Sequence, residues 1–120
     1  MLFTNEQMLN SLSVLAQAEE KGLLGFAIAT NRRKLTDEVK EYAAKREELL
    51  KEYGTEKEPG VYSISSDAVP AFSAALKPYA EMTTDVAVRT VSEEVFCSGS
   101  LTSSQMIVLE WMVKEGEPNA

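Results

Sequence analysis

The residues of this chain that could do chemistry are few, and the most suggestive is Cys97, which precedes the small polar run Ser98–Ser100. A thiol there could act as a nucleophile if a base or a nearby positive charge lowered its pKa. The chain has no histidine, and Arg89 is the only cation near Cys97 in the sequence. We therefore interpret Cys97 as an ordinary thiol at the end of a strand, and we predict no catalytic residues.

Two charged clusters also come into question. Glu93 and Glu94 are adjacent, so on a strand their side chains point to opposite faces, which does not suit a paired-carboxylate site. Residues 31–34 (Asn-Arg-Arg-Lys) form the only basic cluster. Four consecutive helical positions fan around the helix axis. We interpret this cluster as a solvated helix turn, with a local contact to an anion as the alternative.

The composition of the chain argues against several classes of binding site and ligand. The absence of histidine and the single cysteine predict no metal site and no internal disulfide. There is no glycine-rich phosphate loop, and we predict no cofactor. A net charge of −7 opposes binding to nucleic acid and to anionic membranes. Neither a bilayer-spanning run nor a basic leader is evident, so we expect a cytoplasmic protein.

The element that must organise these residues is one long helix, predicted over Leu23–Tyr53 between Gly22 and Gly54. Its apolar residues recur at spacings of three, four and seven, which is typical of a stripe along one helix face. The stripe consists of Leu24, Ile28, Leu35, Val39, Tyr42, Leu49 and Tyr53.

A shorter helix precedes the long one. Thr4 and Gln7 fit a capping box, and Phe3 before the cap can pack on Met8. We expect this helix to end near Gly22 and to fold back on the long helix as an antiparallel hairpin. It is too short to cover more than the first half of the stripe.

The middle of the chain predicts smaller elements. Residues 55–60 are a polar loop, and Val61–Ser65 alternates as a strand does. A short helix is expected over Ala68–Leu76, limited by Pro78. The segment Thr84–Phe96 is rich in β-branched residues and predicts a second strand.

Two strands alone are marginal, so we expect these two to pair with each other and pack on a helix, or to recruit a third strand. Met1–Phe3 is a candidate edge strand. A second capping box, Thr102 with Gln105, begins a C-terminal helix that we expect to end at Gly116, with residues 117–120 frayed. We expect Trp111 of this helix to pack on the uncovered half of the long helix.

Together these elements predict a single α+β domain over residues 1–120. It comprises a helical hairpin (1–54), a loop (55–60) and a strand, short helix, strand and C-terminal helix (61–116). The uncovered half of the long helix requires either a later segment of this chain or a second copy, so a homodimer is one possibility. The candidate protein-contact stripe consists of Val39, Tyr42, Leu49, Tyr53 and Trp111.

The residues that mark these helices carry a resemblance. Several segments resemble a family of small uncharacterised proteins encoded by tailed phages and prophages of Gram-positive bacteria. They are Leu2–Asn10, Phe26–Asn31 leading to Lys34 and Leu35, Arg46–Gly54, Leu101–Gln105 and Leu109–Val113. The resemblance implies a phage or prophage origin and the cytoplasm of a bacterial host. It implies no activity and no functional residues.

Our leading hypothesis is a non-enzymatic protein that acts through protein–protein contacts, in phage assembly or in contact with the host. The alternative is an acidic inhibitor that mimics nucleic acid and blocks a host nuclease or defence complex, which the net charge of −7 motivates. Such a mimic requires carboxylates gathered on one face.

Overall fold

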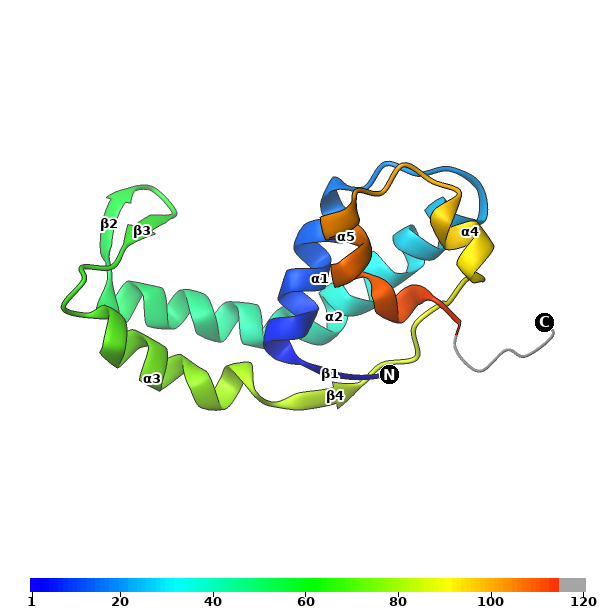
Figure 1. Cartoon of the computed structure of the whole chain (residues 1–120). Coiled ribbons are helices and arrows are strands. Elements are labelled where there is room, and N and C mark those ends of the chain that lie inside the picture. The colour runs from blue at the N-terminus through cyan, green and yellow to red at the C-terminus, as the bar shows by residue number, and fades with distance from the viewer. Residues whose placement is uncertain (115–120) are drawn as a thin grey trace.

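The computed structural model describes residues 1–114, which form an elongated α+β fold around one long helix (Figure 1). The helices are α1 (Asn5–Gln17), α2 (Gly22–Tyr53), α3 (Val69–Ala80), α4 (Glu93–Cys97), α5 (Ser103–Val108) and the 3₁₀ helix η1 (Glu110–Met112). The strands are β1 (Leu2–Thr4), β2 (Thr55–Glu58), β3 (Val61–Ser63) and β4 (Thr83–Asp85). The expected frayed tail, 117–120, lies outside the described residues.

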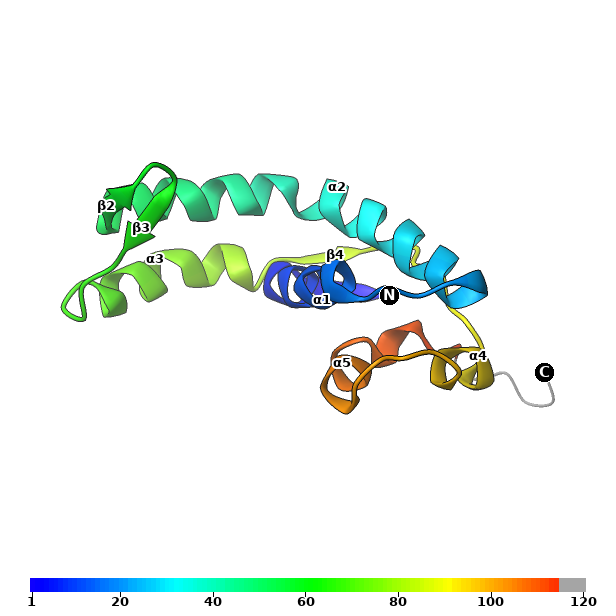
Figure 2. The same cartoon turned by 90° about the horizontal axis from the view of Figure 1, so that it is seen from above.

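Helix α2 runs the length of the molecule, with α1 packed on its first half and α3 on its second half (Figure 2). Both run antiparallel to α2. The first half of α2 with α1, α4, α5 and η1 forms what we call the head. The second half of α2 with α3, β2 and β3 forms what we call the arm. The principal extents of 53 × 27 × 23 Å reflect this arm.

The predicted hairpin is confirmed, although its first helix is shorter than expected. Thr4 and Gln7 form the capping box, with Gln7 N donating to Thr4 Oγ1 at 3.1 Å. Helix α1 ends at Gln17 rather than near Gly22, because Ala18 is already extended and begins a loop. Within that loop Glu20 accepts hydrogen bonds from the backbone N–H and the hydroxyl of Ser100. These hydrogen bonds connect the loop between α1 and α2 to the loop between α4 and α5.

The second half of α2 is covered by α3, and this answers the question that the sequence left open. Helix α3 continues past the expected end at Leu76 to Ala80, through Pro78. Pro78 is exposed, whereas Ala80 beyond it is buried. The proline costs the helix a backbone hydrogen bond, and packing on α2 offsets that loss. At the far end of the arm, the Tyr53 and Phe72 rings meet edge to face at 6.4 Å.

The predicted strands are found in part where they were expected, but the prediction of how they pair was wrong. Residues 55–60 are not a loop, because β2 pairs antiparallel with β3 around a turn in which Gly60 has φ +81°. The edge strand at the N-terminus is confirmed as β1, and its partner is β4. The two predicted strands, observed as β3 and β4, therefore do not pair with each other, because β3 pairs with β2 and β4 pairs with β1.

Two further predictions near the C-terminus were wrong. Within the expected strand Thr84–Phe96, only Thr84 and Asp85 belong to β4. The segment after them has no regular secondary structure until Ser92 caps α4 by accepting from Val95 N at 3.2 Å. The expected helix up to Gly116 is α5 followed by η1, although its capping box at Thr102 is confirmed. The helix breaks at Leu109, and Val113 then forms a parallel bridge with Val91.

Candidate protein-contact groove around Trp111

The predicted contact stripe does not form one surface. Val39, Tyr42 and Leu49 are buried within the chain, and Tyr53 is half-buried in the arm. Trp111 lies at the other end of the molecule, in the head, and packs on α1 rather than on the second half of α2. The stripe on α2 is therefore core, and Trp111 has to be considered separately.

Trp111 is held by β1 and α1. Its ring meets the ring of Phe3 edge to face, with centroids 5.1 Å apart, and its indole N–H donates to Ser11 Oγ at 3.1 Å. Phe3 and Ser11 are both buried. The short turn of η1 brings Trp111 onto this platform and leaves the indole half-buried. The tryptophan is thus fixed in orientation while part of its ring stays accessible.

This hydrogen bond makes a direct prediction. Ser11→Ala should lower the free energy of unfolding by about 1 kcal/mol, because the indole N–H loses its acceptor in a largely buried place. Urea unfolding followed by the fluorescence of Trp111, the only tryptophan, measures the change. Ser13→Ala, an exposed serine on the same helix, is the control and should change stability by less than about 0.5 kcal/mol.

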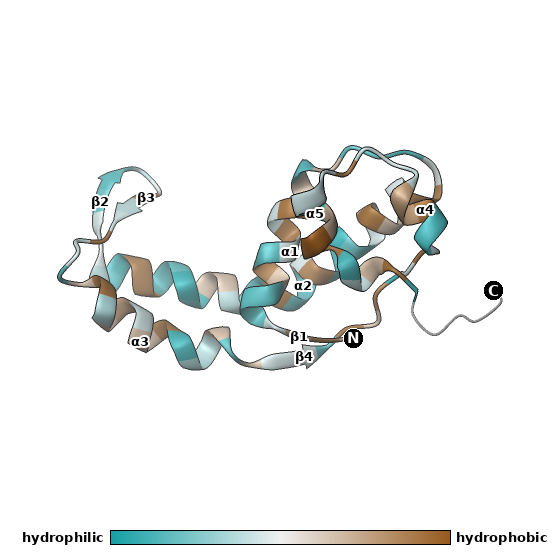
Figure 3. Ribbon diagram, in the orientation of Figure 1, coloured by the Kyte–Doolittle hydropathy of each residue, from teal (hydrophilic) through white to brown (hydrophobic). Residues whose placement is uncertain are grey.

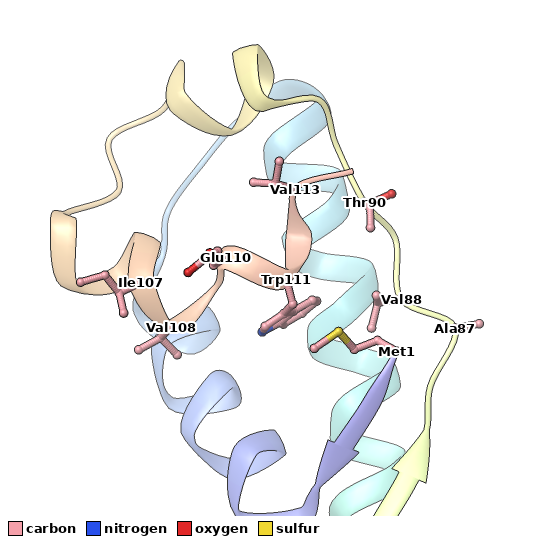
Figure 4. A pocket seen from close by; sticks show the side chains of 9 residues that line it. All are labelled: Met1, Ala87, Val88, Thr90, Ile107, Val108, Glu110, Trp111 and Val113. Atoms are coloured by element: carbon pink, nitrogen blue, oxygen red, sulfur yellow. The ribbon is translucent and has the colours of Figure 1, made fainter. Parts of the chain in front are cut away.

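An open groove of about 620 Å³ lies beside Trp111. Figure 4 shows it between η1 on one side and the segment 86–91 on the other, with Met1 at one end. Ile107 is 72% exposed and Met1 51% exposed, although both are large apolar residues. The lining of the groove is mainly apolar and consists of Met1, Ala87, Val88, Thr90, Ile107, Val108, Glu110, Trp111 and Val113.

A smaller hollow of about 230 Å³ lies against the same tryptophan and shares Met1, Val108 and Trp111 with the groove. The C-terminal turn of α5, beside both, is among the most hydrophobic parts of the ribbon (Figure 3). The two hollows together bring partly exposed apolar side chains onto one face of the head.

The wall formed by residues 86–91 has no regular secondary structure before Val91 and is held at both ends. Val86 N donates to Met1 O at 2.9 Å, and Val91 N donates to Met112 O at 2.8 Å. From behind, the side chain of Asn31 bonds both backbone groups of Arg89. Thr90, which lines the groove, makes no hydrogen bond to another described residue. The backbone N–H and C=O of Thr90 are therefore free among the described residues, between Arg89 and Val91, whose backbone groups are paired.

The other candidate residues do not converge on a site. Cys97 is exposed at the end of α4 rather than at the end of a strand. Glu93 and Glu94 lie in the first turn of α4, where the helix dipole stabilises negatively charged side chains. Asn31 is fully buried, so the basic cluster is not the solvated turn that we expected. Lys34 donates to Ala87 O at 2.6 Å, which leaves only Arg32 and Arg33 exposed.

The groove residues Met1, Val88 and Ile107 were missed by sequence reasoning, because an exposed apolar residue has the same sequence signature as a core residue. Among residues 1–114 no group of three or more potential ligands is placed to hold a metal ion. None of the helices in that range combines the length and the apolar composition that a membrane crossing requires.

Comparisons of the chain with protein-family models, with curated proteins and with solved structures find no match.

Proposed function

We propose that this protein is non-enzymatic and acts by binding another protein through the groove around Trp111. The observation that carries the proposal is the apolar groove itself, whose rim residue Ile107 is 72% exposed. The resemblance described above supports a phage or prophage setting, in assembly or in contact with the host.

The occupant that fits the groove is a short extended segment of the partner. Its apolar side chains would cover Trp111 and Val88, and its backbone would meet the free groups at Thr90, in the manner of strand addition. Among residues 1–114, Glu110 has the only charged side chain that lines the groove. Together with a net charge of −7, it favours a segment that carries a lysine or an arginine beside its apolar residues.

The alternative of a nucleic-acid mimic receives no support from the arm. The acidic and basic residues of the arm lie side by side on α2, where Lys45 is 3.4 Å from Glu48 and Lys51 is 3.9 Å from Glu47. A mimic needs an uninterrupted row of carboxylates, because phosphates in nucleic acid carry one sign of charge.

Selection from a displayed library of random peptides tests the proposal. We expect the enriched peptides to combine at least two apolar residues with one basic residue. Ile107→Glu should weaken their binding by about tenfold or more, because a carboxylate would replace apolar contact at the rim. Leu23→Glu is the matched control, since Leu23 is 70% exposed on α2 and does not line the groove.

Two results would contradict the proposal. One is equal loss of peptide binding in the Ile107 and Leu23 variants. The other is a dimer in light scattering that Ile107→Glu abolishes, which would assign the groove to a second copy of the chain.

A further inference from the structure

A second cleft, of about 490 Å³, lies where α1 and α3 meet end to end on α2. The two helices are joined there by backbone, since Asn5 N donates to Met82 O at 3.0 Å. Leu9, Leu76 and Ala80 give the cleft an apolar floor, and the remaining lining side chains are polar or charged. This volume is in the range of small-molecule sites.

Tyr42 lines the cleft and is only 6% exposed, yet its hydroxyl has no hydrogen-bond partner among residues 1–114. No side-chain polar atom in that part of the chain is both fully buried and unbonded, so the hydroxyl still opens into the cleft. Burial raises the pKa of Tyr42 above its usual value of 10.0. At neutral pH the group is therefore a protonated donor that lacks an acceptor.

Charges of both signs flank this hydroxyl. Arg46 lies one turn further along α2 and forms no ion pair among the described residues, and its charge lowers the pKa of Tyr42 while Glu6 raises it. At the rim, Lys77 is 4.0 Å from Glu81. A guanidinium is suited to hold a carboxylate. Glu6 and Glu81 disfavour a second negative charge.

We propose that this cleft binds a small monocarboxylate with a short apolar body. The carboxylate accepts hydrogen bonds from Arg46 and from the hydroxyl of Tyr42, and the apolar body lies on Leu9, Leu76 and Ala80. Multiply charged anions such as phosphate are excluded by the two carboxylates of the lining. The site is separate from the groove around Trp111.

NMR titration of the whole chain with 4-methylpentanoate tests the site. We expect saturable shifts of the Tyr42 ring signals, and we expect 4-methylpentanamide, its neutral counterpart, to bind at least about tenfold more weakly. Inorganic phosphate should leave these signals unchanged. Absence of saturable shifts with the carboxylate, or equal binding of the amide, would overturn the proposal.

Three variants locate the binding. Tyr42→Phe removes only the hydroxyl and keeps the buried ring, and Arg46→Gln removes only the charge. Each should weaken 4-methylpentanoate binding, followed in every variant by the backbone amide signals of residues that line the cleft, by about fivefold or more. Arg33→Gln, an exposed arginine on the same helix outside the cleft, should leave it unchanged. If Arg33→Gln weakens binding as much as Arg46→Gln does, the loss comes from the change in net charge, and the proposed site is wrong.

Discussion

Asn31→Ala is expected to lower the free energy of unfolding by about 2 to 4 kcal/mol, because two backbone groups of Arg89 lose their partner. The side chain of Asn31 is fully buried, its Nδ2 donates to Arg89 O at 2.8 Å, and Arg89 N donates to its Oδ1 at 2.7 Å. Chemical unfolding followed by circular dichroism measures the change. Asn10→Ala, at an exposed asparagine, is the control and should stay within about 0.5 kcal/mol.

Asn31→Asp sharpens this test. A carboxylate keeps the acceptor for Arg89 N but faces Arg89 O, while a protonated carboxyl can still donate to that oxygen. Burial should raise the pKa of the introduced carboxyl above about 3.9. The folded state then binds the proton more tightly than the unfolded state, so stability should fall as pH rises through the folded pKa. A variant whose stability relative to the wild type does not depend on pH would contradict the assigned hydrogen bonds.

Gly25→Ala is expected to destabilise the protein by about 2 kcal/mol, although alanine normally favours a helix over glycine by about 1 kcal/mol. A Cβ atom at Gly25 would collide with the backbone carbonyl oxygen of Glu20 and would lie 2.8 Å from its carbonyl carbon. Backbone cannot swing aside as a flexible side chain can, so the α1–α2 loop has to move.

Thermal and urea unfolding measure the effect. Ala29→Gly, at an exposed position on the same helix, gives the ordinary cost of a glycine in α2. If Gly25→Ala stabilises the protein by the amount that Ala29→Gly destabilises it, the close approach of the loop is wrong. Because Glu20 also holds Ser100, we further expect Gly25→Ala to weaken the contact between the loop and residues 98–101.

Local signals in the sequence predicted the parts of the fold that depend on neighbouring residues. The capping boxes at Thr4 and Thr102 are both present, because each needs only a partner three residues away. The long helix was predicted within one residue of its observed bounds, Gly22–Tyr53. Its continuous 3.6-residue periodicity has no competing interpretation.

Tertiary contacts decided the rest. The β-branched composition of residues 84–96 favours a strand, but the cap at Ser92 starts a helix that buries Phe96. Strand pairing could not be derived either, since β1 meets β4 from the opposite end of the chain. The role of Asn31 was hidden for the same reason, because its partner Arg89 lies 58 residues away.

The candidate groove was predicted only through Trp111. The expected partner of that residue was wrong, because the C-terminal helix was assigned to the second half of α2, which α3 covers instead. Trp111 packs on Phe3 and Ser11. The groove is lined by three separate segments, Met1, residues 87–90 and residues 107–113, which no local pattern connects.

The emission of Trp111 is the most direct measurement of the central claim, that the groove binds a segment of another protein. Trp111 is the only tryptophan and lines the groove. Titration with a peptide enriched from the displayed library should shift its emission to shorter wavelength, with a saturation curve that Ile107→Glu displaces and Leu23→Glu does not. A peptide that binds the protein tightly and leaves the emission of Trp111 unchanged would contradict the claim.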